Sequence, residues 1–142
     1  MKLGLKTLTL GVAVATLGQS TISRGHGMTP EFALAIMLAT VRVCEMTYPD
    51  MQTSLVSARN AWKARNAPLL APIEKILASK GGNMQSLVDM FVEETKKEKG
   101  SIERSSCEQL SESLADARND AQFKAWFAPG NREFSIPVRP RP

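Results

Sequence analysis

One long apolar stretch limits what this chain can fold into. Residues 32–46 read FALAIMLATVRVCEM, and Arg42 is the only charge between Glu31 and Glu45. A helix without a polar face must be covered on all sides, and about fifteen residues are too few to cross a bilayer comfortably. We therefore predict that this stretch is the central helix of a bundle. The alternative is that a second copy covers its other face, which would make a homodimer through the apolar first helix.

The ends of this helix carry clear signals. Thr29 suits the N-cap, Pro30 the first helical position and Glu31 the first turn. Pro49 forces a boundary at the other end. The first helix is thus expected from about residue 30 to 47.

The remaining pattern is helical as well. A second helix is expected over about 50–66, where Met51, Leu55, Ala58 and Trp62 form an apolar stripe. Prolines 68 and 72 then make 69–79 either a bent continuation or a separate short helix, and KGGN at 80–83 ends it. Asn83 can cap a third main helix, and a last long helix is expected from about 101 to 127, with Ala117 and Ala121 among its inward residues. No useful alternating segment predicts strands, so we expect an all-α bundle of four to five helices.

The first twenty residues have the layout of a secretory signal peptide. Lys2 and Lys6 form the positive region, and the uncharged stretch 7–17 follows. We expect residues 1–20 to be a signal peptide, 21–28 a flexible lead-in, 29–127 the helical domain and 128–142 an extended tail. The location would then be periplasmic or secreted, with no stable membrane span after signal removal.

The net charge of +4 belongs to the two ends of the chain. Two of the excess lysines lie in the signal segment, and the rest of the excess comes from Arg132, Arg139 and Arg141 in the tail. Residues 21–127 are neutral overall, so the composition does not support a nucleic-acid partner.

Cys44 and Cys107 are the only cysteines. A cysteine nucleophile needs a nearby base, and the single histidine, His26, lies in the expected lead-in. A structural zinc site needs four ligands, whereas cysteine and histidine together supply three here, so no metal is expected. An even cysteine count, an export signal and placement on different helices favour a disulfide, with free buried thiols or an intermolecular bridge as alternatives.

Two groups of residues are candidates for partner binding. Trp62, Arg65 and Asn66 share a helix face, and tryptophan and arginine are frequent hot-spot residues. The competing interpretation assigns Trp62 to the core, Arg65 to solvent and Asn66 to the helix end. In the proline-containing tail, Arg132, Arg139 and Arg141 could form a binding arm or a simple disordered terminus.

Nothing in the sequence indicates catalysis or a cofactor. The last helix carries Glu103, Glu108, Glu112, Asp116 and Asp120, but several follow at i,i+4, as on an ordinary solvated face. A Gly-rich phosphate loop, a GxSxG turn and an HExxH helix are all missing from the sequence.

The signal segment, C-x3-YP at Cys44 to Pro49, WxxRN at Trp62 to Asn66 and a second cysteine some sixty residues later resemble small uncharacterised exported proteins of Gram-negative bacteria. The resemblance covers roughly residues 30–127. It implies a periplasmic helical domain and carries no active site to transfer. We expect a non-enzymatic module that binds another exported or envelope protein, of inhibitor, immunity or adaptor type; the alternative is a carrier or sensor of a small apolar ligand held between the helices.

The disulfide can be tested directly by thiol alkylation. The purified mature protein should take up no label without reductant and two labels after reduction and unfolding. Closing a loop of this length should stabilise the fold by about 4 kcal/mol, less any strain. Two reactive thiols in the unreduced, unfolded protein would contradict the pairing.

Overall fold

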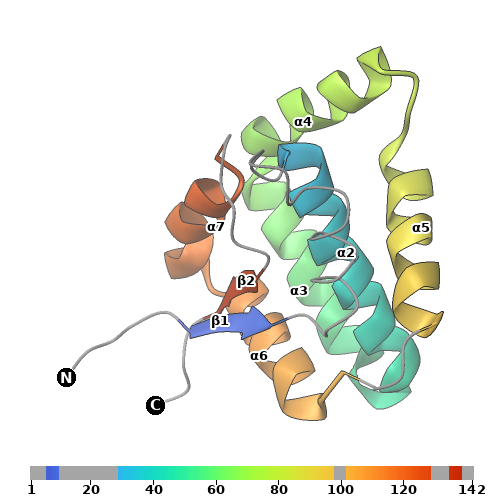
Figure 1. Ribbon diagram of the computed structural model, residues 1–142. Coiled ribbons are helices and arrows are strands. Elements are labelled where there is room, and N and C mark those ends of the chain that lie inside the picture. The colour runs from blue at the N-terminus through green and yellow to red at the C-terminus, as the bar shows by residue number, and fades with distance from the viewer. Residues whose placement is uncertain (1–5, 10–28, 98–101, 129–134, 139–142) are drawn as a thin grey trace.

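A computed structural model of the 142-residue chain describes residues 6–9, 29–97, 102–128 and 135–138. Helices make up most of this part of the chain (Figure 1). In chain order the elements are β1 (Lys6–Thr9), α2 (Pro30–Thr47), the 3-10 helix η1 (Pro49–Met51), α3 (Gln52–Arg65), α4 (Ala67–Ser79), α5 (Met84–Lys97), α6 (Arg104–Ala115), the 3-10 helix η2 (Ala117–Asn119), α7 (Asp120–Trp126) and β2 (Ser135–Val138).

The apolar helix α2 lies in the middle of the other helices. It begins at Pro30, and the Thr29 hydroxyl accepts a hydrogen bond from the Phe32 amide at 3.4 Å, as the capping pattern predicts. Ala35, Met37 and Val41 have no exposed surface. Helices α3, α4, α5 and α6 all contact α2 (Figure 1). A single chain therefore covers this helix, and its burial requires no second copy.

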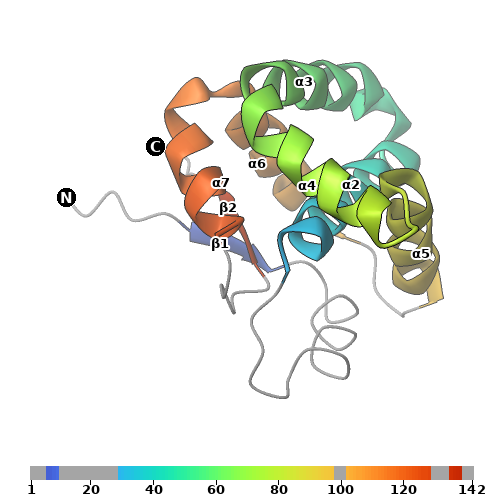
Figure 2. The same ribbon diagram turned by 90° about the horizontal axis from the view of Figure 1, so that it is seen from above.

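The proline-containing segment after Asn66 forms a separate helix, α4. Pro68 occupies the first turn, where a helix does not need its missing N–H, and Pro72 lies inside the helix. Leu70, Ile73 and Leu77 are its buried residues. Seen from above, α4 runs across one end of the bundle, over α2 (Figure 2).

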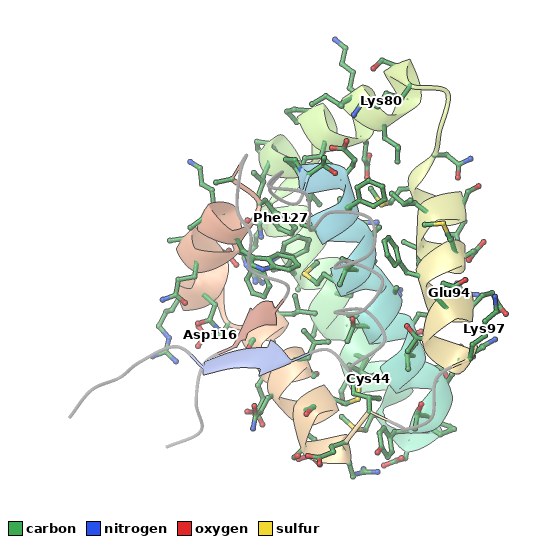
Figure 3. All side chains as sticks on the ribbon, viewed as in Figure 1. Cys44, Lys80, Glu94, Lys97, Asp116 and Phe127 are labelled. Carbon is green, nitrogen blue, oxygen red and sulfur yellow. A yellow bond between two sulfur atoms is a disulfide. The ribbon has the colours of Figure 1, made fainter. Side chains whose placement is uncertain are left out.

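The turn between α4 and α5 fastens the start of α2. Gly81 has a φ of 79°, a conformation that favours glycine, and the Asn83 side chain accepts a hydrogen bond from the Ser86 amide at 2.8 Å. Lys80, at the end of α4 (Figure 3), donates from Nζ to Oε1 of the buried Glu31 at 2.8 Å. The predicted turn thus also supplies the counter-charge of a buried carboxylate.

The expected continuous helix over 101–127 is wrong. Asp116 is extended, with φ −94° and ψ 107°, and its carboxylate accepts a hydrogen bond from the Arg118 amide at 2.9 Å. Aspartate favours such capping because its short side chain competes for backbone N–H groups. The chain therefore divides into α6 and α7, which makes six α-helices in the described residues instead of four to five.

The division also changes which residues face the core. Ala117 and Ala121, expected to point inward, are exposed, whereas Phe123 is completely buried. Asn119 is buried in the new corner, where its Nδ2 donates to the Ser113 carbonyl at 3.1 Å. A prediction that continues one helical period through residue 116 therefore places the residues of α7 on the wrong face.

The two cysteines join the end of α2 to the start of α6. Their Sγ atoms lie 2.10 Å apart, at disulfide-bonding distance, and both residues are completely buried. Figure 3 shows Cys44 near the lower end of α2. Tyr48 reinforces the junction, because its hydroxyl donates to the Ile102 carbonyl at 2.7 Å. The predicted pairing and the meeting of these two helix ends agree with this geometry.

A short two-stranded sheet was not expected from the sequence. β1 and β2 pair antiparallel, with Lys6 opposite Val138 and Thr9 opposite Ser135, and β2 lies against α6 and α7. Each strand has only four residues, too few to produce a recognisable alternation. Because β1 falls inside the expected signal segment, this sheet exists only in a chain that retains residues 6–9. The expected lead-in, residues 21–28, lies entirely outside the described residues, and of the expected tail only residues 128 and 135–138 are described.

The Glu31–Lys80 pair predicts a dependence of stability on pH. Burial alone would raise the pKa of Glu31, but hydrogen bonds from Lys80 and the backbone, together with the Lys80 charge, outweigh it and lower the pKa. A lowered pKa in the folded state means that ionised Glu31 stabilises the fold above the pKa of the unfolded chain, and that this contribution disappears as pH falls through the folded-state value.

Glu31→Gln should therefore lower the free energy of unfolding at pH 7 by about 1 kcal/mol, since Lys80 is largely solvated. Its difference from the wild type should shrink between about pH 5 and pH 3. Urea denaturation across this range measures it. Glu94→Gln is the matched control, because Glu94 makes a similar lysine contact on an exposed helix face. A Glu31→Gln loss that is no larger than the control, or that does not vary with pH, would contradict the assignment.

Candidate binding sites

The WxxRN residues lie at the corner between α3 and α4, next to α7. Trp62 has no exposed surface, and its ring packs against Phe123 at 5.6 Å and Phe127 at 5.8 Å between centroids. Phe127 lies between α7 and the centre of the molecule (Figure 3). Trp62 is therefore used inside the fold, where it holds α7 against α3, as in the interpretation that placed it on the apolar stripe.

Arg65 connects three helices. Its Nε donates to Asp120 Oδ2 at 2.9 Å, and one terminal nitrogen donates to Asp120 Oδ1 at 3.2 Å and to the Leu114 carbonyl at 2.6 Å. The hydrogen bonds and charge of Asp120 raise the pKa of Arg65 above its ordinary value. The guanidinium thus fastens the end of α3 to the last turn of α6 and the start of α7.

Asn66 forms the corner itself. Its side chain is buried and donates to the Trp62 carbonyl at 2.8 Å, while its own carbonyl accepts from the amides of Leu69 and Leu70. The structure therefore brings the three predicted residues together, but Trp62 and Asn66 present little surface to a partner.

An open pocket lies directly beside this corner. It has a volume of about 400 Å³, and its lining is mainly apolar. It is formed by the end of α3, the start of α4 and one side of α7, through Arg65, Asn66, Pro68, Leu69, Asp120, Ala121 and Lys124. We call it the corner pocket.

The exposed side of α4 continues the apolar surface beyond this pocket. Pro68, Pro72 and Ile76 are exposed and follow one another at i, i+4 and i+8, so they share one side of the helix. Ile76 is 45% exposed, one of the most exposed large apolar residues among those described. We call these three residues the α4 ridge.

A groove of different character opens between α2, α3, α4 and α5. Its volume is about 370 Å³, and its lining is largely polar. The residues are Leu38 and Arg42 of α2, Arg59, Asn60 and Lys63 of α3, Glu74 of α4, and Met84, Gln85 and Val88 of α5. We call it the four-helix groove. One of its residues stood out in the sequence, since Arg42 is the only charge between Glu31 and Glu45.

The acidic residues of the last helices take part in ion pairs. Asp120 binds Arg65, Asp116 binds Arg118 at 2.8 Å, and Glu108 lies 3.3 Å from Arg104. Across residues 29–97 and 102–128, no three histidine, cysteine or acidic side chains gather closely enough to hold a metal ion. Both cysteines are bonded to each other, so neither offers a free thiol.

Arg132, Arg139 and Arg141, the predicted binding arm, lie outside the described residues. Their role stays a prediction.

Comparison with known proteins yields no relative: no family model, no curated protein and no solved structure matches this chain. Within the described segments, no single helix is both long enough and apolar enough to cross a membrane. Only the bent pair of Pro30–Thr47 and Pro49–Arg65 meets these two criteria, at an angle of 118°.

The Arg65 contacts predict a specific loss on conservative substitution. Arg65→Lys keeps the charge but cannot bridge the Asp120 carboxylate and the Leu114 carbonyl in the same planar geometry, so it should lower the free energy of unfolding by about 1–2 kcal/mol. Arg118→Lys is the control, because Arg118 pairs with Asp116 two residues away and its side chain is 75% exposed. Urea denaturation should show no measurable change in stability for this control, because water screens an exposed ion pair. If the two substitutions lower the free energy of unfolding equally, the bridging role of Arg65 is contradicted.

Proposed function

We propose that this chain is an exported, non-enzymatic helical module that binds another exported or envelope protein through the corner pocket and the α4 ridge. The observation that carries the proposal is an exposed apolar ridge that leads into a mainly apolar pocket on a rigid corner. Contiguous exposed apolar surface of this kind is typical of sites where proteins associate.

The corner is well suited to bind a partner because buried packing and hydrogen bonds fix the positions of the helix ends that form it. Trp62 packs under it against Phe123 and Phe127, and Arg65 clamps the neighbouring helix ends. A preorganised site loses less side-chain entropy on binding, which favours affinity. The predicted partner-binding role of Arg65 and Asn66 thus becomes a supporting one, at the rim of the pocket.

The rim indicates the chemistry of the partner. Pro68, Leu69 and Ala121 offer an apolar surface, and Lys124 stands beside them with no carboxylate within 4.0 Å among the described residues. Arg65 and Asp120 neutralise each other. The best-fitting partner segment has an apolar anchor for the pocket, flanked by a carboxylate that pairs with Lys124.

Export is part of the proposal. The signal-like N-terminus motivates it, and a cysteine pair at disulfide-bonding distance agrees with an oxidising compartment such as the periplasm or the cell exterior. A helical inhibitor, immunity or adaptor protein of this compartment would need no cofactor.

The test is affinity purification from envelope and periplasmic extract with three baits. Ala121→Arg fills the pocket from an exposed position and should leave the fold intact, since Ala121 is outside the core. A partner enriched by the wild type should fall by at least about tenfold with this bait, the loss expected when an interface anchor is blocked.

Ala78→Arg is the matched control, because Ala78 is exposed on α4 and does not line the pocket. It should retain the partner. Enrichment of the same proteins by all three baits, or of none by the wild type, would overturn the proposal. A photo-crosslinker placed at position 121 but not at 78 should join the bait to the same partner.

A further inference from the structure

The four-helix groove contains the one place where the middle of α2 reaches the surface. From Ala33 to Val41 every residue of α2 is buried except Leu38, and Arg42, one turn later, is exposed. Both line the groove. The central helix of the fold therefore forms the floor of this opening, and α3 and α5 contribute its walls.

Positive charge exceeds negative charge among the residues that line this opening. Arg42, Arg59 and Lys63 line it, against the single carboxylate of Glu74. Arg59 donates to Glu45 at 3.1 Å, whereas Arg42 and Lys63 have no carboxylate within 4.0 Å in the described part of the chain. Like charges around one concavity repel one another and raise the local concentration of anions.

The same opening offers apolar contacts beside the cations. Leu38, Met84 and Val88 come from the floor and from α5, while Asn60 and Gln85 add amide groups. A volume of about 370 Å³ lies near the lower end of the range typical of small-molecule sites. It fits a head group with a short stem better than a full-length lipid.

From these observations we infer that the four-helix groove binds a small organic anion with a carboxylate or phosphate head and a short hydrocarbon stem. The head group lies between Arg42 and Lys63, and the stem lies against Leu38, Met84 and Val88. This inference goes beyond the proposed function, because none of the groove residues belongs to the corner pocket or the α4 ridge. It also differs from a carrier of purely apolar ligands, since the groove lining is mainly polar.

The test uses three probes that separate the head from the stem: hexyl phosphate, inorganic phosphate and hexanol. Isothermal titration calorimetry should give the tightest binding for hexyl phosphate, with both fragments weaker by at least about tenfold. Methyl NMR signals of Leu38, Met84 and Val88 should shift with hexyl phosphate and locate the probe in the groove.

Two variants test the cations one at a time. Arg42→Gln and Lys63→Gln should each weaken the binding of hexyl phosphate by about tenfold, the effect expected for one charge-assisted hydrogen bond. Both side chains are exposed, so the fold should be retained, and circular dichroism checks it. If one variant is unfolded, the other carries the test.

Lys75→Gln is the matched control, because Lys75 is exposed on α4, changes the net charge equally and does not line the groove. It should bind hexyl phosphate as the wild type does. Equal weakening by all three variants would show a non-specific charge effect and overturn the inference. Absence of methyl shifts, or tighter binding of a hexaglutamate peptide than of hexyl phosphate, would overturn it as well. Loss of the partner in the bait experiment leaves this test unaffected, since Ala121 is not part of the groove.

Discussion

The covering of α2 is the constraint on which the rest of the fold depends. A helix that is apolar almost all round must remove every side from water, and burial of each large apolar side chain contributes about 1.5–3 kcal/mol. No single neighbouring helix can do this. α3, α4, α5 and α6 therefore all contact α2, and the turns that redirect the chain between them lie at the ends of the bundle (Figures 1 and 2). The Pro49 boundary and the glycine-containing turn at 80–83 redirect the chain so that successive helices can cover α2.

The last helical segment, residues 102–128, is the helical part farthest from α2 in sequence, and besides the packing of Trp62 against α7 it is held by specific contacts at two points. At its start, the Cys44–Cys107 pair, the Tyr48 hydrogen bond and the Arg104 guanidinium over the Tyr48 ring hold α6 to the end of α2. At its middle, Arg65 holds the α6–α7 corner to the end of α3. Long-range contacts like these carry the largest loop-closure cost, which explains why a covalent bond and an arginine fork occur at these two points.

Local signals in the sequence were sufficient for the first part of the fold and insufficient for the last. Thr29, Pro30 and Pro49 act within one helical turn of where they stand, so α2 could be predicted with both of its ends. Asp116 is different, because aspartate occurs on many exposed helix faces and caps a new helix only where the chain has to turn. Phe123 could not be recognised as a core residue for the same reason, since its burial depends on that turn. The corner pocket also required tertiary structure, because it combines residues of α3, α4 and α7.

Arg42 and Arg65 show how the fold changes the meaning of a charged residue. In the sequence, Arg65 has the features of a hot-spot residue, near a tryptophan and an asparagine. Arg42 is only the one charge between Glu31 and Glu45. In the fold, Arg65 donates hydrogen bonds to Asp120 and to the Leu114 carbonyl, so few of its N–H groups remain for a partner. Arg42 has no such contact in the described chain and lines a groove with two further cations, Arg59 and Lys63, and one carboxylate, Glu74. Because Arg42 is exposed, water solvates its charge and the fold needs no partner for it. The guanidinium therefore stays available to the anion that we propose for the groove.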